Sequence, residues 1–298
     1  MVLPERDGIP PSRVYLTRGP WKTLLEFLCE RFPRIPPAVL RQRLQAGEIV
    51  DDHGAAQAPD SAYVPERWLW YYREVPDEAA VPFALEILYR DASLIAVDKP
   101  HFLASTPGGR YLRETALTRL REQLALPHLS PMHRLDRETA GVLLFCADPA
   151  KRGAYQALFQ SREVRKEYEA WAPWRADLAF PLRYCSRVEA VPGRFVMREM
   201  EGEANSETHV DVLARRGDWA CYRLRPMTGR KHQLRVHMNA LGMAILNDRF
   251  YPECVAADAE DDLSRPLQLL ARAIEFIDPF SGESRRFESR RVLQGPPD

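Results

Sequence analysis

Short apolar runs of about five residues most constrain what this chain can fold into. Residues 85–89 (LEILY) and 93–97 (SLIAV) are two such runs, and only residues 90–92 (RDA) separate them. Paired runs of this length with a short polar break between them predict a β-hairpin. We therefore expect a β-sheet in the core of the chain from about residue 84 onward.

Further strands and helices are predicted along the same part of the chain. Strands are expected at residues 142–146, 167–171, 209–214 and 219–224, and helices at residues 150–159 and 231–241. Hairpins are more evident than a regular alternation of strands and helices, and no internal repeat is present. The pattern predicts the α+β class.

Residues 1–78 carry a different pattern and are predicted to form a small separate unit. Apolar residues recur at helical spacing over residues 21–32 and 39–44, which predicts two short helices, and residues 48–50 predict a strand. The segment 73–83 is rich in proline and acids and is the expected linker. We place the boundary after residue 78, so that residues 79–298 form the larger unit.

The sequence excludes several classes of protein. No run of about 18 apolar residues occurs, and the first residues lack the apolar stretch of a signal peptide, so we expect a cytoplasmic protein. The cysteines are scattered and form no CxxC pair, which predicts reduced thiols rather than disulfides or a zinc site. They are Cys29, Cys146, Cys185, Cys221 and Cys254.

The charges of the chain cancel, with 42 Lys and Arg against 42 Asp and Glu. This balance disfavours a general polyanion binder, whose net charge is clearly positive. Eight basic residues nevertheless fall within residues 215–249, opposed only by Asp218 and Asp248. They either form a local basic surface or lie on different faces, and both alternatives stay open at this point.

The densest polar cluster is residues 133–141 (HRLDRETAG), directly before the apolar run at residues 142–146. Loops at the ends of core strands often carry catalytic residues. Asp136 has Arg134 and Arg137 close in sequence, and nearby cations lower the pKa of a carboxyl group and keep it anionic, as a nucleophile must be. The alternative is a surface turn with local ion pairs.

Residues 133–145 (HRLDRETAGVLLF) resemble the signature of the RluA-type RNA pseudouridine synthases. Further segments resemble other motifs of this family: VDKP at 97–100, REVRKEYEA at 162–170, LRPMTGRKHQLRVHMNALG at 224–242 and LLARAIEF at 269–276. The resemblance covers roughly residues 84–290. The chain departs from the family pattern at Ala140, Lys231 and Leu270, where Ser, Thr or Ser, and His are common.

The resemblance implies the pseudouridine synthase fold for residues 79–298, with a mixed, largely antiparallel central sheet and flanking helices. The helix–helix–strand order of residues 1–78 resembles an S4-like RNA-binding domain, in which Arg41 and Arg43 would contact RNA. The alternative for this unit is an appendage with a packing role.

The resemblance also implies a role for three residues in the isomerisation of uridine. Asp136 matches the catalytic aspartate of the family, and Arg235 matches the arginine that pairs with it, a planar fork that can hold a carboxylate at two points. Tyr168 matches the active-site tyrosine, which could stack on the base and assist removal of the C5 proton. A phenol with a pKa near 10 is a poor base at neutral pH, so this role requires a lowered pKa or a proton relay.

Other residues of the motifs are expected to contact RNA. Arg134 matches the position that inserts into the RNA when the target nucleotide leaves the stack. The remaining expected RNA contacts are Arg137, Lys166, Thr228, Gly229 and Arg230. His133 and His237 are expected to be structural. The reaction needs no cofactor, and the sequence shows neither a metal-ligand constellation nor a GxGxxG loop.

Two competing functions and the choice of substrate stay open. A non-catalytic RNA-binding protein could share this scaffold, and a glycoside hydrolase could use Asp136 together with Glu138, the acid nearest to it in sequence. The expected partner is structured RNA, either large-subunit rRNA or a tRNA stem-loop, bound by a monomer. The sequence does not identify the uridine.

Overall fold

The computed structural model describes residues 3–4, 6, 10–33, 35–73, 78–254 and 260–297. The chain divides into two compact units, Met1–Glu78 and Ala79–Asp298, which are described separately. They are called here the N-terminal and the C-terminal unit. Part of the predicted linker, residues 74–77, lies outside the described residues.

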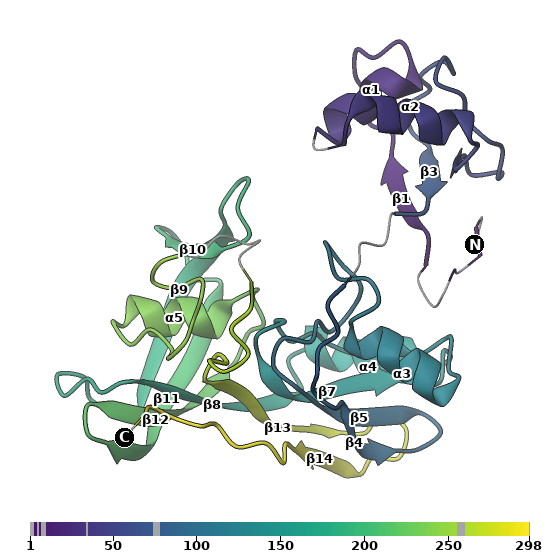
Figure 1. Cartoon of the computed structure of the whole chain (residues 1–298). Coiled ribbons are helices and arrows are strands. Elements are labelled where there is room, and N and C mark those ends of the chain that lie inside the picture. The colour runs from purple at the N-terminus through teal and green to yellow at the C-terminus, as the bar shows by residue number, and fades with distance from the viewer. Residues whose placement is uncertain are drawn as a thin grey trace. The chain divides into compact units, whose positions relative to one another are not determined.

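The N-terminal unit is a three-stranded antiparallel sheet packed against two helices (Figure 1). The strands pair in the order β1 (Ser12–Tyr15), β3 (Trp68–Tyr71) and β2 (Ile49–Val50), and the helices are α1 (Leu24–Arg31) and α2 (Pro37–Gln45). Thr23 and Glu26 form a capping box, which begins α1 later than predicted. The prediction of two helices before a strand is confirmed, whereas β1 and β3 were not predicted.

The C-terminal unit is built on an eleven-stranded sheet. The main path runs β10-β9-β11-β12-β8-β13-β7-β5-β4, with β14 beside β13 and β6 beside β7. The strands are β4 (Glu86–Arg90), β5 (Leu94–Lys99), β6 (Ser130–Pro131), β7 (Ala140–Cys146), β8 (Arg165–Pro173), β9 (Leu182–Ala190), β10 (Met197–Met200), β11 (Ser206–Arg216), β12 (Trp219–Pro226), β13 (Leu269–Ile277) and β14 (Ser284–Glu288).

Among the described strand pairs, β7 and β13 run parallel and the other pairs are antiparallel. The prediction of an α+β fold with a mixed, largely antiparallel sheet is confirmed. The predicted hairpin is β4 and β5, and the predicted strands at 142–146, 167–171, 209–214 and 219–224 belong to β7, β8, β11 and β12.

Three helices cover the sheet: α3 (Ala116–Leu124), α4 (Arg152–Gln160) and α5 (Gln233–Ala240). Successive side chains of a strand point to opposite faces, and β5 and β7 bury both. Leu94 packs with α4 and Ile95 with α3, so these two helices cover opposite faces. The predictions included α4 and α5 but not α3. Among the described residues, no helix is long and apolar enough to cross a membrane.

Gly141 lies where β7 meets β13, directly after the polar loop that contains Asp136. It has a φ of +112° and pairs with Ala271. A Cβ atom at this position would lie 2.2 Å from the carbonyl oxygen of Ala271. Only glycine fits both the dihedral angle and the close approach of the two strands.

We expect Gly141→Ala to lower the free energy of unfolding of the C-terminal unit by about 3 kcal/mol or more, because it adds a backbone clash to an unfavourable φ. Urea unfolding followed by circular dichroism measures the change. Gly153→Ala is the matched control: it lies in α4, a Cβ there meets nothing within 4 Å, and alanine favours a helix. Equal stability of the Gly141→Ala variant and the parent would contradict this account.

Candidate active site

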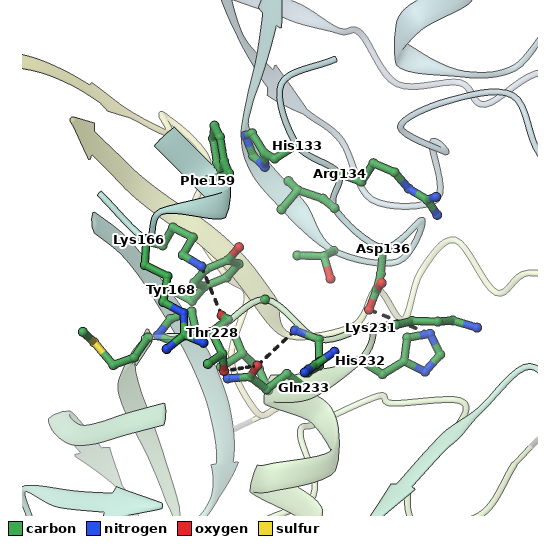
Figure 2. A pocket seen from close by; sticks show the side chains of 18 of the residues that line it. His133, Arg134, Asp136, Phe159, Lys166, Tyr168, Thr228, Lys231, His232 and Gln233 are labelled. Carbon is green, nitrogen blue, oxygen red and sulfur yellow. Dashed lines mark hydrogen bonds and ion pairs between the residues drawn. The ribbon is translucent and has the colours of Figure 1, made fainter. Parts of the chain in front are cut away.

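A cavity of about 820 Å³ lies beside the loop before β7, with walls from α4, β8 and the start of α5 (Figure 2). It brings together side chains that are far apart in sequence. Of the site residues predicted in this unit, those that line it are Arg134, Asp136, Lys166, Tyr168, Thr228, Gly229, Arg230 and Arg235. Arg137 is not among the lining residues. Four of the five motif segments therefore contribute residues to one cavity, and VDKP at 97–100 does not line it.

The loop that carries Asp136 is held by hydrogen bonds on both sides of it. Leu135 is bonded through its backbone to the side chain of Ser105: its N–H donates to Oγ over 3.0 Å, and its carbonyl accepts from Oγ over 2.7 Å. The N–H of Thr139 donates to the carbonyl of Asp136 over 3.1 Å. Satisfied backbone groups fix the direction of the intervening side chain.

Lys99 and His101 hold the next part of the same loop. The ammonium of Lys99 is fully buried and donates to the carbonyls of Pro100, Leu103 and Arg137 over 3.0, 2.8 and 3.2 Å. His101 donates from Nδ1 to the carbonyl of Glu138 over 2.7 Å. Burial lowers the pKa of Lys99 to about 7, against the opposing charge of Glu138. Lys99 of the VDKP segment and His101 thus hold the loop that carries Asp136.

Asp136 faces the side chains of Arg235, on α5, and of His232, in the turn before this helix. Its Oδ2 lies 3.5 Å from Nη1 of Arg235 and 4.0 Å from Nε2 of His232. The Asp136 side chain is 26% exposed, whereas those of Arg235 and His232 are fully buried. The carboxylate is therefore open to the cavity and backed by a buried cation. Figure 2 shows Asp136 and His232 together on one side of the cavity.

Arg235 does not hold Asp136 at two points, and this part of the prediction is wrong. Its fork holds Asp248, with Nε–Oδ2 at 2.8 Å and Nη2–Oδ1 at 2.5 Å, and Nη1 also lies 3.4 Å from Glu138. Asp248 is fully buried as well, so it is the main neutralising partner of the guanidinium. Asp136 takes the remaining, longer contact.

The three carboxylates around Arg235 also bear on the glycoside hydrolase alternative. Asp136 and Glu138 both approach the same Nη1 atom of Arg235, at 3.5 and 3.4 Å. Two acids that share one cation do not flank a sugar from opposite sides, as that mechanism requires. Asp248, in residues 247–252 (NDRFYP), was not predicted as a site residue, because a single acid in an irregular loop gives no periodic signal.

Tyr168 lies on β8 and lines the cavity opposite Asp136 (Figure 2). Burial, with a contribution from the negative charge of Asp136, raises the pKa of Tyr168 above its ordinary value. The lowered pKa that a direct base would require is therefore not found. Tyr168 is a neutral phenol in this site, able to stack and to donate a hydrogen bond.

The segment before α5 forms the floor of the cavity. Thr228 donates from its hydroxyl to Oε1 of Gln233 over 2.6 Å and accepts from the N–H of Glu207 over 2.9 Å. Lys166 donates to the carbonyl of Thr228 over 3.1 Å, and burial lowers the pKa of Lys166 to about 8. Gln233 was not predicted as a site residue. Its Oε1 also accepts from the backbone N–H of Arg230 over 3.1 Å, which stabilises this turn.

Arg134 and Arg137 differ sharply, although both flank Asp136 in sequence. Arg134 is exposed, lines the cavity and makes no side-chain hydrogen bond or ion pair with a described residue. Arg137 is 12% exposed and pairs with Asp261 and, at 3.6 Å, with Glu138. Arg134 therefore forms no ion pair with Glu138, its neighbour in the same loop.

The basic residues between positions 215 and 249 do not share one surface. Arg230, Lys231 and Arg235 line the cavity. Arg215 lies over the ring of Trp174 near the opposite end of β12, and Arg223 and Arg225 contact Glu167. The dispersed alternative is confirmed for this stretch.

Among the described residues, no group of three or more His, Cys, Asp or Glu could hold a metal ion.

The two histidines expected to be structural have clear structural partners. His133 accepts at Nε2 from the N–H of Leu144 over 3.2 Å and stacks on Phe159 with ring centroids 4.8 Å apart. His237 is fully buried and bonded to Ser206 and Thr208. His232, which was not predicted, lies beside Asp136 and has no hydrogen-bond partner for its Nε2 among the described residues.

Comparison with known proteins identifies the class. A family model described as RNA pseudouridylate synthase matches residues 93–240. The dual-specificity RNA pseudouridine synthase RluA of Escherichia coli is 35% identical over 211 residues, which cover 69% of this chain and 92% of that protein. The RluA of Haemophilus influenzae is 32% identical over 221 residues, 69% of this chain and 93% of the relative.

Solved structures agree with this fold. Human RNA pseudouridylate synthase domain containing 4 is 25% identical, with a TM-score of 0.54 over 70% of this chain and 89% of its own. Human RNA pseudouridylate synthase domain containing 1 is 23% identical, with a TM-score of 0.58 over 72% of this chain and 86% of its own. The C-terminal unit is therefore an RNA pseudouridine synthase, an isomerase. Within that class, the chain belongs to the RluA-type family.

This assignment decides two of the open questions. The chain is an enzyme, so the readings as a non-catalytic RNA-binding protein and as a glycoside hydrolase are both wrong. The family model begins at residue 93 and does not reach the N-terminal unit. The match therefore assigns no family to the three-stranded sheet and two helices of the N-terminal unit.

We expect the enzyme to lose stability as the pH falls from 6.5 to 5. Burial lowers the pKa of His232 to about 3, with Arg235 contributing, and that of His237 to about 4. In the unfolded chain both titrate near 6.5, so below this pH the unfolded state binds more protons. The contribution of these histidines to stability is fully present above about pH 6.5. Below this pH, each histidine lowers the free energy of unfolding by up to about 1.4 kcal/mol per pH unit.

Urea unfolding at pH 6.5 and pH 5 measures this loss. His237→Gln is the informative variant, because it removes one of the buried histidines with a lowered pKa, which also include His101 and His133, and should make the decline between the two pH values smaller. A parent protein with the same free energy of unfolding at both pH values would contradict the assignment of buried, neutral histidines.

Proposed function

We propose that this enzyme isomerises specific uridines in rRNA or tRNA stem-loops, with Asp136 as the catalytic carboxylate. The observation that carries the proposal is the position of Asp136: it is open to a large cavity, while a fully buried guanidinium, Arg235, lies 3.5 Å behind it. A cation in this position favours the anionic carboxylate. Lys166, Arg230 and Lys231 line the same cavity and favour a polyanionic substrate.

The reaction breaks the N1–C1′ bond of uridine, rotates the base and joins C5 to C1′. The Asp136 carboxylate can attack C1′, stabilise a positive charge on the sugar or remove a sugar proton, and each route needs the anion. Arg235 is a positioning residue in this proposal. Its fork is fixed by Asp248, so Nη1 is presented to Asp136 without freedom to turn away.

Tyr168 has a role that does not depend on ionisation. As a neutral phenol it can stack against the uracil ring and hold it near Asp136 while the base turns. Loss of the C5 proton then passes through a relay rather than directly to a phenolate, because the pKa of Tyr168 is raised. Lys166 keeps a positive charge over much of the neutral range and suits a phosphate contact.

A stacked uridine hides C1′ and C5, so the substrate nucleotide must leave its stack to reach Asp136. Arg134 is suited to fill the vacated place: it is exposed at the cavity and its side chain is not committed to another described residue. Thr228, Gly229 and Arg230 are proposed to contact the flipped nucleotide from the floor. Arg137 is proposed to contact RNA only after it leaves Asp261.

The N-terminal unit is proposed to bind RNA as well, and the S4-like hypothesis assigns that role to Arg41 and Arg43 on α2. Arg41 is exposed and Arg43 half-buried. The two units together are proposed to act as a monomer on one structured RNA, a stem-loop of large-subunit rRNA or of tRNA.

We expect Asp136→Asn to reduce turnover by about 1,000-fold or more, because asparagine keeps the shape but removes the anion, a loss of about 4 kcal/mol or more of transition-state stabilisation. Release of tritium from RNA labelled at C5 of uridine measures turnover, and filter binding shows that RNA affinity is nearly kept. Asp218→Asn, an exposed acid in the β11–β12 turn, is the control and should behave as the parent. Near-parental turnover of Asp136→Asn would remove Asp136 from this role.

We expect Arg134→Ala to impair a structured stem-loop more than a short unstructured RNA with the same uridine. Extruding a base from a stem-loop costs a few kcal/mol and less from a flexible strand, and alanine cannot fill the vacated space. Single-turnover rates on the two RNAs measure the difference. Arg286→Ala on β14, outside the cavity, is the control. An equal loss on both RNAs would exclude the base-flipping role.

A further inference from the structure

The sheet of the N-terminal unit has one face that its helices do not cover. Along β1, Val14 is 5% exposed and belongs to the core shared with α1 and α2, whereas Tyr15 is 40% exposed. Because successive side chains alternate, Arg13 and Tyr15 point away from the helices. The strand register pairs Arg13 with Trp70 and Tyr15 with Trp68. These four residues, Arg13, Tyr15, Trp68 and Trp70, are called here the outer face.

The four side chains of the outer face contact one another as a continuous layer. The guanidinium of Arg13 lies 4.2 Å from the ring centroid of Trp68 and 5.4 Å from that of Trp70. The rings of Tyr15 and Trp68 lie 5.0 Å apart, inclined at 59°. The four side chains include one cation and no acid, and the exposed Asp52 lies at their border, where its Oδ2 accepts from the backbone N–H of Trp68 over 3.3 Å.

The outer face is not a second hydrophobic core. The core of this unit contains Val14, Leu24, Leu28, Leu44 and Leu69 among others, and neither Trp68 nor Trp70 belongs to it. The indole Nε1 of Trp70 is buried and has no hydrogen-bond partner among the described residues. An indole N–H without a partner costs about 1–3 kcal/mol, so no hydrogen bond to a described residue holds this ring in place.

The surface beside α2 is less suited to RNA. The hollow next to this helix is lined by Arg41, but also by Glu26 and Glu30. Two carboxylates repel a phosphate backbone at short range and offset the single arginine. The outer face has the opposite balance: three aromatic rings on which bases can stack and a guanidinium that can stack or bind phosphate.

We propose that the outer face binds unpaired nucleotides that flank the stem-loop containing the target uridine. Stacking needs bases that are free of a partner, and it tolerates any sequence, because every base has a π-face. The inference rests on the stem-loop substrate proposed above. It moves the RNA contact of this unit from the helix that carries Arg41 and Arg43 to the sheet.

The test compares two RNAs and two double variants of the full chain. One RNA is the bare stem-loop, and the other carries about six unpaired nucleotides at each end, enough to span a small stacking site. We expect the parent to bind the extended RNA about tenfold more tightly. Arg13→Glu combined with Tyr15→Ala should abolish that gain and leave affinity for the bare stem-loop within about twofold of the parent. Both side chains are exposed, so the fold should persist.

The matched control is Arg31→Glu combined with Gln45→Ala, two exposed positions at the ends of α1 and α2 in the same unit. It should keep the gain. Three outcomes would each overturn the proposal. The control alone could lose the gain in affinity, the outer-face variant could lose affinity equally for both RNAs, or the parent could show no gain. Turnover on the bare stem-loop is read in parallel. If the parent does not modify it, the proposed substrate fails, whereas the binding comparison still tests the outer face.

A second measurement uses the unaltered protein and does not depend on how the variants fold. The unpaired extensions are synthesised with 4-thiouridine, irradiated in the complex and digested, and the cross-linked peptides are identified by mass spectrometry. We expect peptides that contain residues 13–15 or 68–70. Cross-links confined to α2 or to the C-terminal unit would overturn the proposal.

Discussion

The site depends on how one buried cation is neutralised. Arg235 is fully buried, and a guanidinium without water must have carboxylates within contact distance. Asp248 satisfies most of this need at two points, and Glu138 and Asp136 share the remaining nitrogen at 3.4 and 3.5 Å. Because the two buried acids already neutralise the cation, Asp136 is oriented by Arg235 without being consumed in a tight ion pair. Of these three carboxylates, that of Asp136 faces the cavity.

This arrangement requires a rigid loop, and the rest of the fold supplies it. The β5 strand ends at Lys99, whose ammonium donates to three carbonyls around the loop, and Ser105 holds Leu135 from the adjacent segment. Gly141 lets β7 approach β13 closely directly after the loop. The core strands therefore fix the Asp136 carboxylate beside the start of β7, inside the strand order, where it lines the cavity.

Much of this could be predicted from the sequence, because local patterns carry local structure. The apolar runs predicted the β4–β5 hairpin, and the motifs led to Asp136, Tyr168 and Arg235. The partners of those residues could not be predicted in the same way. Arg137 adjoins Asp136 in sequence but turns to Asp261, 124 residues later, and the partner of Arg235 lies in an irregular loop. Such contacts depend on tertiary packing, which has no periodic signature.

Burial raises the pKa of Tyr168, and the negative charge of the nearby Asp136 adds to this shift. The carboxylate opposes ionisation of the nearby phenol, so the two groups are not both anionic in the free enzyme. If Asp136 bonds to C1′, as one proposed route requires, its negative charge is lost, and only burial then raises the pKa of Tyr168. The phenol becomes a better proton relay after the glycosidic bond has broken than before. On that route, the same pair of residues therefore favours cleavage first and loss of the C5 proton later.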